Sequence, residues 1–116
     1  MIGDVVELPG GLVGVIGERT NGAPVRWRVY FRINHLEVSQ ITATLDPASF
    51  EVGETVVVWP DRGDITSIDG DLVTVEATRQ MELAPHEFVT WTATLVVPMW
   101  HIARYNDPRI SDTAAP

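Results

Sequence analysis

Histidines are the side chains best suited to acid–base or metal chemistry in this sequence, and there are three: His35, His86 and His101. They lie far apart, and except for Glu87 beside His86 none has a second His, Asp or Glu at a ligand-like spacing. Zinc and iron sites usually show at least one such local pair. We therefore interpret the histidines as ordinary surface or half-buried residues and expect no bound metal.

Aspartates gather between residues 61 and 71, where four of them fall within eleven positions. Calcium-binding loops alternate oxygen ligands around a required glycine and end in a bidentate glutamate. Here the acids bracket a stretch expected to be a strand, so we interpret them as turn formers. The Arg-Gly-Asp tripeptide at 62–64 matches a cell-adhesion motif. Because the sequence shows no secretion signal, we interpret that match as chance.

Nucleophilic and phosphate-binding chemistry also lack the residues that they need. The sequence contains no cysteine, and no serine lies in a Gly-x-Ser-x-Gly turn with a plausible histidine and acid after it. The glycine-rich stretch 9–14 has no following lysine and leads into an expected strand instead of a helix. We therefore predict that the protein is not an enzyme and holds no cofactor.

The strict alternation of residues 25–33 predicts a strand with one apolar face and one basic, aromatic face. The second face, here called the Arg stripe, is the best candidate partner site: Arg26, Arg28, Tyr30 and Arg32. Cationic and aromatic groups side by side suit acidic protein surfaces or nucleic acid. Alternatively, the face is solvated and its arginines pair with cross-strand acids such as Glu7 or Glu37.

The net charge of −8 is unevenly distributed. Residues 1–45 hold four acids and four arginines, whereas residues 46–116 hold twelve acids and four arginines. A protein this acidic repels phosphate backbones unless a local basic face overrides the field. Nucleic acid is therefore expected to be only an incidental partner, whereas the near-neutral part of one copy could attract the acidic part of another.

The length of 116 residues is that of one domain with a single core. No stretch approaches the roughly 18 apolar residues of a membrane span, and Asp4 and Glu7 stand where a signal peptide would be basic. We expect no contact with a membrane. We also expect one β-rich domain at 1–105 and a flexible C-terminal tail at 106–116, which is too small and polar to pack.

Short apolar runs separated by Gly, Pro, Asn and Asp predict an all-β, mainly antiparallel fold. This would be a small β-barrel or sandwich with SH3-like features and about seven to nine strands. Asp69-Gly70, between two apolar runs, predicts a two-residue hairpin turn with positive φ at both positions. The alternating strands at 25–33 and 88–97 should place six side chains in one shared core: Trp27, Val29, Phe31, Trp91, Ala93 and Leu95.

Three further segments leave alternatives open. Residues 77–86 are compatible with one or two helical turns closed by Pro85, and residues 99–105 with a short edge strand. Residues 3–8 and 53–58 share a pattern of glycine, acid and valines at a spacing of fifty residues. This echo is typical either of a duplicated half-barrel or of unrelated strands.

Size and three motifs together resemble the small head-to-tail connector proteins of tailed phages, the stopper or head-completion class. The motifs are the opening at 3–8, the Thr-Asn-Gly loop at 20–22 before Trp27, and the hairpin at 68–75, which together touch about a third of the chain. The resemblance implies a small β-barrel with inserted loops, repeated as a ring between portal and tail, and it implies no catalytic residues. The sequence departs from that class in two places: residues 77–86 are poorly defined, and the strand from Pro85 to Trp100, with its Thr-rich face, has no counterpart.

The leading hypothesis is therefore a non-enzymatic virion structural protein, made in the host cytoplasm, that forms a ring by placing the Arg stripe against the acidic face of a neighbour. Its expected partners are copies of itself and adaptor, portal or tail proteins. The alternatives are a monomeric SH3-like module that binds a peptide or nucleic acid through Trp27, Tyr30, Trp59 or the Arg stripe, and a capsid decoration or other tail protein.

Overall fold

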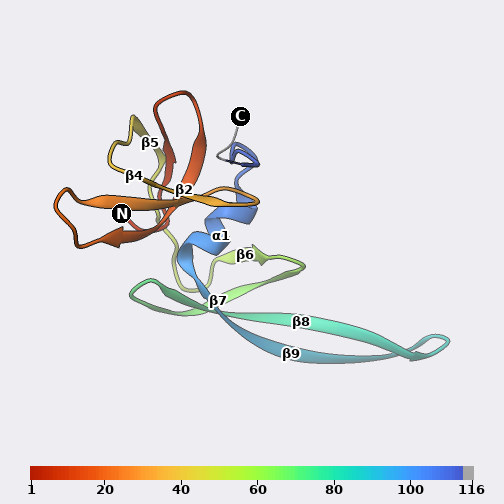
Figure 1. Cartoon of the computed structure of the whole chain (residues 1–116). Helices are drawn as coiled ribbons and strands as arrows, with labels where there is room; N and C mark the ends of the chain where they lie inside the picture. Colours follow the sequence, from red (N-terminus) through yellow and green to blue (C-terminus); the bar gives the residue numbers. More distant parts are fainter. Residues whose placement is uncertain (114–116) are drawn as a thin grey trace.

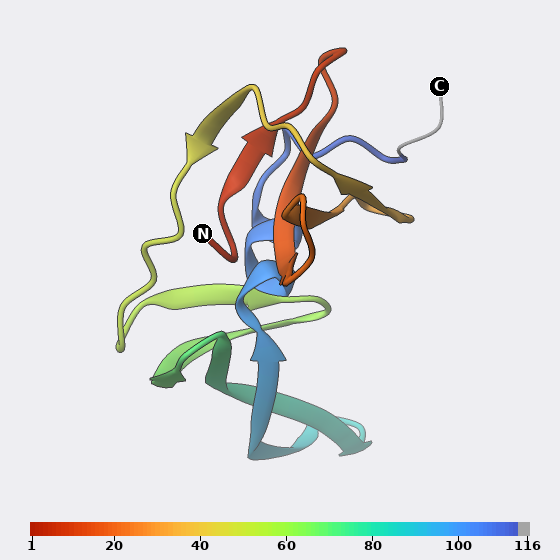
Figure 2. The same cartoon turned by 60° about the vertical axis from the view of Figure 1, so that its left-hand side comes forward.

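The computed structural model describes residues 1–113, which form two antiparallel sheets with a short helix packed between them (Figures 1 and 2). The all-β fold expected from the sequence is confirmed, and the described residues hold nine strands. The arrangement is sandwich-like, and neither sheet closes into a barrel.

The first sheet has the order β4-β3-β2-β1-β5. Four strands form a meander, and the fifth returns to pair with the outer edge of β1. Side chains alternate between the two faces of a strand, so Val6, Ile16 and Val29 fill a core on one face while Val5 and Val15 are buried on the other. The strands are β1 (Val5–Glu7), β2 (Val13–Thr20), β3 (Arg26–Tyr30), β4 (His35–Val38) and β5 (Ala43–Asp46).

The second sheet has the order β6-β7-β8-β9. Its buried side chains, among them Val56, Ile65 and Val75, form a separate cluster. The strands are β6 (Thr55–Val58), β7 (Asp61–Asp69), β8 (Leu72–Ala84) and β9 (Glu87–Pro98).

Helix α1 (Met99–Asn106) follows β9 and lies between the two sheets, which the chain connects through residues 47–54. Ile102 is fully buried among the valines of the second sheet, and its neighbour Ala103 packs with Val5 and Val15 of the first. A helix satisfies its own backbone groups, so it can lie between two sheets without pairing to either. Because residues 99–106 are helical, the predicted edge strand at 99–105 is wrong.

The single shared core expected from the two alternating strands is also wrong. Val29 and Phe31 are buried in the first sheet, whereas Leu95 packs against the cluster of the second. Trp91 is 42% exposed, and Ile33, expected on the apolar face of its strand, is 78% exposed. The period of a strand predicts which side chains share a face, but it does not say how far along that face the core extends.

The hairpin between β7 and β8 is confirmed, but its register differs from the expectation. Asp69 pairs with Leu72, so the turn residues are Gly70 and Asp71. Gly70 has a φ of 58°, and it is the only one of the two with a positive φ. A type II′ turn needs positive φ only at its first position, whereas a type I′ turn needs it at both. The turn is therefore of type II′, and the predicted positive φ at both positions is wrong.

Residues 107–113 pack against the body instead of forming the flexible tail expected at 106–116. Ile110 is 4% exposed, and Ser111 exchanges backbone and side-chain hydrogen bonds with Val13. Arg32 and Ile33 donate their backbone N–H groups to the carbonyls of residues 111 and 112. The remainder of the expected tail, 114–116, lies outside the described residues.

The two sheets repeat one local structure. Gly3 and Gly53 have φ values of 89° and 94°, and each donates its N–H at 2.7 Å to the carbonyl of an isoleucine, Ile16 and Ile65. A register shift follows each isoleucine, at 16/18 in β2 and at 65/67 in β7. The sequence echo at 3–8 and 53–58 therefore corresponds to a structural repeat in which β6-β7-β8 matches β1-β2-β3.

Candidate functional site

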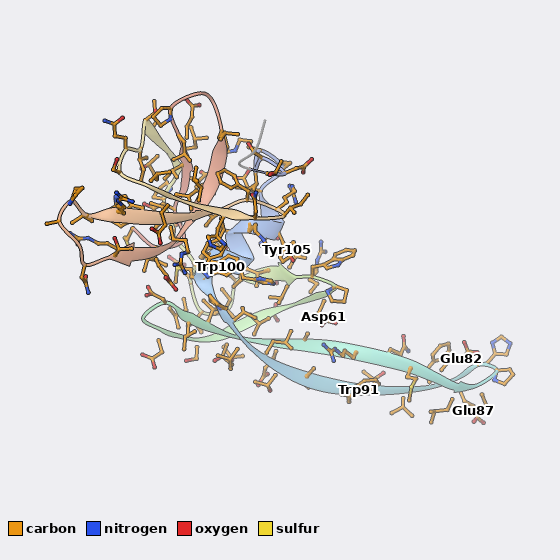
Figure 3. The ribbon with its side chains drawn as sticks, in the orientation of Figure 1. Asp61, Glu82, Glu87, Trp91, Trp100 and Tyr105 are labelled. Atoms are coloured by element: carbon orange, nitrogen blue, oxygen red, sulfur yellow. The ribbon has the colours of Figure 1, made fainter. Side chains whose placement is uncertain are left out.

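A long hairpin extends from the second sheet away from the rest of the molecule (Figures 1 and 3). It consists of the outer parts of β8 and β9, and we call residues 78–92 the arm. It contributes to an elongated shape with principal extents of 57 × 31 × 21 Å. The helical turns considered for 77–86 are absent, because β8 stays paired with β9 until the turn at Pro85 and His86.

The arm carries the apolar face of the second sheet beyond its core. Strand pairing places Arg79 opposite Trp91 and Met81 opposite Val89, on the same side of the sheet as the buried Val75. The three apolar side chains of this extension are 50% exposed for Met81, 41% for Val89 and 42% for Trp91. The arm therefore presents part of a core face with no described residue of the chain covering it.

The opposite face of the arm is polar along most of its length. Thr78 pairs with Thr92 and Gln80 with Thr90, and these side chains are exposed. Near the turn, Glu82 pairs with Phe88, which is 54% exposed. The arm is therefore amphipathic, with an acidic end that holds Glu82 and Glu87 (Figure 3).

An ion pair fixes the base of the arm. Arg79 on β8 donates from Nε and Nη2 to the two carboxylate oxygens of Asp61 at 3.2 and 2.6 Å. The hydrogen bond from Arg79 lowers the pKa of Asp61 below its ordinary value. A bidentate guanidinium–carboxylate contact restrains orientation as well as distance, so the pair holds the arm relative to β7.

The Arg stripe is largely occupied by contacts within the chain. Arg28 lies 3.1 Å from a carboxylate oxygen of Glu18 and 3.3 Å from one of Glu37. The contact with Glu37 is one that the alternative of a solvated face, with arginines paired to cross-strand acids, predicts. Arg32 lies 3.8 Å from Asp112 and donates a hydrogen bond to the carbonyl of Asp107. Arg26 is exposed.

Tyr30, the aromatic member of the Arg stripe, packs against the helix that lies between the sheets. Its ring stacks on that of Trp100 with a centroid distance of 3.9 Å and an interplanar angle of 4°. His101 meets Trp100 and Tyr105 edge-on, and burial, with Arg104 nearby, lowers the pKa of His101. This aromatic cluster stabilises the junction between helix α1 and the first sheet. One face of the Tyr30 ring is covered by Trp100.

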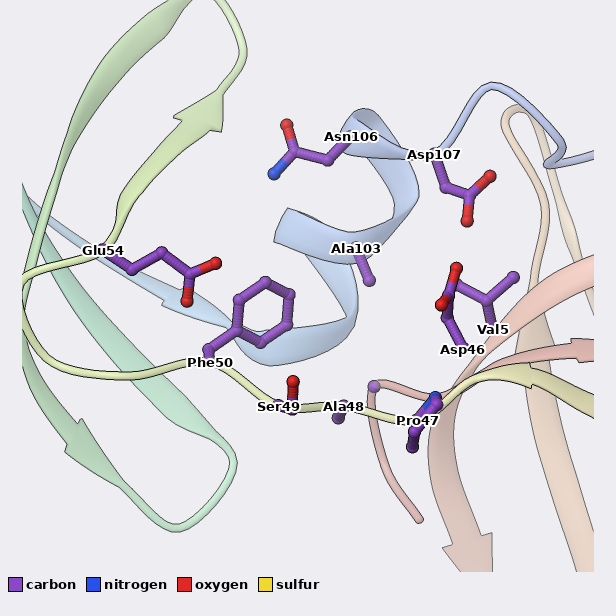
Figure 4. Close-up of a pocket in the computed structure, with 11 residues that line it drawn as sticks. Val5, Asp46, Pro47, Ala48, Ser49, Phe50, Glu54, Ala103, Asn106 and Asp107 are labelled. Atoms are coloured by element: carbon purple, nitrogen blue, oxygen red, sulfur yellow. The ribbon is translucent and has the colours of Figure 1, made fainter.

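A pocket of about 240 Å³ opens between the two sheets (Figure 4). Phe50 lies at its base, and Glu54 and Asn106 face each other across it. Two of its carboxylates already bind Arg109, which pairs with Asp46 and Asp107. The hydrogen bond from Arg109 lowers the pKa of Asp107. These carboxylates therefore act as structural ties, and we assign no ligand to the pocket.

Two of the three histidines, His35 and His101, lie beside the stacked rings of Tyr30 and Trp100, whereas His86 lies in the turn of the arm. Across residues 1–113, no group of three or more His, Cys, Asp or Glu side chains is placed to hold a metal ion. His86 occupies the turn of the arm with a φ of 64°, and His35 packs near Tyr30 at a ring distance of 5.4 Å.

Sequence reasoning missed the arm as a functional surface, although a signal for it was present. The alternating apolar and Thr-rich faces of 88–97 continue unchanged past the last residue that the body can cover. On the other side of Pro85, every second residue from Ala77 through Arg79 to Met81 pairs with a residue of the apolar face of 88–97. This segment is therefore the partner strand.

Comparison with protein-family models, with curated proteins and with solved structures finds no match. In the described part of the chain, no helix has the length and apolar character to cross a membrane.

Proposed function

We propose that this protein is a non-enzymatic structural component that assembles with copies of itself, the arm of each copy packing onto the body of the next. The observation that carries the proposal is the uncovered apolar face formed by Met81, Val89 and Trp91. Contiguous apolar surface on a small protein marks an interaction site, because leaving it in water is unfavourable.

A second copy of the chain is the occupant that the arm fits best. The face is continuous with the core of the second sheet, and interfaces between permanent subunits resemble a domain core cut in two. The acidic end at Glu82 and Glu87 disfavours phosphate backbones and anionic lipid surfaces. An arm that projects from one end of the body would join two different patches on identical subunits, and such a contact forms a ring when the rotation between neighbours closes.

Within this class we propose a ring in the virion of a tailed phage, a head-to-tail connector of the stopper type. The support is the resemblance at 3–8, 20–22 and 68–75. The arm has no counterpart in that class and supports only the self-assembly. Imaging of the assembled protein by electron microscopy tests this: a ring with a central channel supports it, and a filament or a compact dimer contradicts it. A decoration protein or another tail protein would share the arm contact but not the channel.

The monomeric binding module is less well supported. Of its candidate aromatic residues, Tyr30 is stacked on Trp100, and Trp27 is half-buried with the guanidinium of Arg19 5.5 Å from its ring. Trp59 is 69% exposed and has no ring contact with another aromatic side chain in residues 1–113.

Adjacent residues on opposite faces of β9 provide a matched test of the proposal. Trp91→Glu places a charge on the apolar face, whereas Thr90→Glu places the same charge on the polar face of the arm. Loss of a central aromatic anchor costs about 2 kcal/mol or more, so Trp91→Glu should weaken self-association roughly 30-fold or more. Light scattering after size-exclusion chromatography measures this. Equal assembly of both variants would contradict the role of the arm.

A further inference from the structure

The structural repeat shows a difference between two equivalent strands. In the first sheet, the outer edge of β1 is paired with β5: the carbonyl of Glu7 accepts a hydrogen bond from the N–H of Thr42 at 2.8 Å, and Val6 lies opposite Thr44. In the second sheet, β6 takes the place of β1, with Val57 equivalent to Glu7. The order β6-β7-β8-β9 leaves β6 at the edge, with no counterpart of β5.

The backbone groups at this open edge follow from antiparallel geometry. The N–H of Ile65 bonds to the carbonyl of Glu54 at 2.9 Å, and inward-bonded pairs recur every second residue. Val56, opposite Gly63, therefore bonds to β7, whereas the N–H and C=O groups of Thr55 and Val57 point outward. Within residues 1–113, no hydrogen bond joins these outward groups to another residue.

The edge of β6 is short, at four residues, and Ile102 of helix α1 packs on the face that holds Val56 and Val58. Natural edges are also protected by charged side chains or bulges, whereas this one carries Val57 and leads to Trp59, which is 69% exposed. Arg62 lies opposite Val57 on β7 and is exposed, and no carboxylate in the described part of the chain lies within ion-pair distance of it. The edge therefore combines unpaired backbone, apolar surface and one available positive charge.

We propose that the outer edge of β6 pairs with β9 of the arm of a second copy, which takes the place that β5 takes on β1. This rests on the proposed self-assembly through the arm and names its receiving surface. β9 is the other edge strand of the same sheet, and its first half lies in the arm, which projects from the body. It can therefore reach a neighbour without a clash between the two bodies. The acids at the end of the arm, Glu82 and Glu87, complement Arg62 of the receiving copy.

Amide hydrogen exchange with single-residue resolution tests the pairing directly. The N–H of Val56 bonds within the subunit and should exchange slowly in both the assembly and the monomeric Trp91→Glu variant. The N–H of Val57 points outward, so it should exchange fast in the monomer and at least 100-fold more slowly in the assembly. Fast exchange of Val57 in the assembly would overturn the inference.

A backbone substitution gives an independent test. Proline is tolerated at an edge position whose N–H faces solvent, so Val57→Pro should keep the sheet and remove only the outward donor. Val57→Thr, which keeps the donor, is the control. We expect Val57→Pro to lower self-association at least tenfold and Val57→Thr to leave it within about twofold, with circular dichroism confirming that both fold.

The outcomes separate the two proposals. If Trp91→Glu prevents assembly and Val57→Pro does not, the arm acts on a different surface and only the inference about β6 fails. If neither variant changes assembly, both the inference about β6 and the proposed function fail. If Val57→Pro does not fold, the exchange rate of Val57 in the wild-type assembly decides.

Discussion

Arg79 and Asp61 form a bidentate ion pair across the base of the arm, with the shorter contact at 2.6 Å. The pair lies on the apolar face at the point where the core ends, since Ala77 on one side is fully buried and Met81 on the other is half exposed. It therefore marks the boundary between the part of the face that the chain covers itself and the part that it presents to a partner.

This relationship predicts a pH dependence with a definite sign. The folded-state pKa of Asp61 is lowered by Arg79, so the contribution of the pair to stability is present above the ordinary aspartate pKa. It is lost as the pH falls below about 4, through the lowered folded value. Carboxyl NMR titration should show the pKa of Asp61 returning toward its ordinary value in Arg79→Gln. An unchanged titration curve would mean that the ion pair does not form in solution.

A second prediction concerns the helix that lies between the sheets. Ile102 is fully buried in the cluster of the second sheet, so Ile102→Ala should lower the free energy of unfolding by about 2–5 kcal/mol. Ile33→Ala removes the same atoms from a side chain that is 78% exposed, and its effect should stay within about 0.5 kcal/mol. Urea denaturation measures both. Similar losses for the two variants would show that the helix does not occupy the position described.

The differing exposures of these two isoleucines show what sequence reasoning could and could not predict. The alternation at 25–33 identifies the strand and buries Val29 and Phe31 correctly. The strand ends at Tyr30, however, and Ile33 falls in the loop that follows. Where a strand stops depends on its tertiary partners, and no local pattern encodes them.

In the arm, too, tertiary contacts override what the local sequence predicts. Residues 79–82 are Arg, Gln, Met and Glu, all good helix formers, which is why a helical turn was an open alternative. Their pairing with 88–91 overrides that preference. The apolar face of 88–97 could be predicted from the sequence, but whether its partner lies in the same chain or in another could not, because burial within a subunit and burial between subunits select the same side chains.

A third prediction tests the turn between β7 and β8. Gly70 has a φ of 58° and open space around its Cα, so only the backbone conformation limits substitution. Gly70→Val should cost about 1–3 kcal/mol, the range for a strained backbone site, whereas Gly70→Asn should cost less because asparagine tolerates the left-handed region. Thermal unfolding compares them. Equal losses for the two would point to a steric cause instead of a conformational one.

Self-assembly through the arm is the central claim, and the mass of the wild-type protein in solution tests it most directly. Native mass spectrometry and sedimentation equilibrium should give one species whose mass is a whole multiple of the 12.8 kDa subunit. Because a closed ring has no free interface left to bind further copies, this mass should stay constant as concentration rises above the assembly threshold. A mass of 12.8 kDa at every concentration would contradict the account.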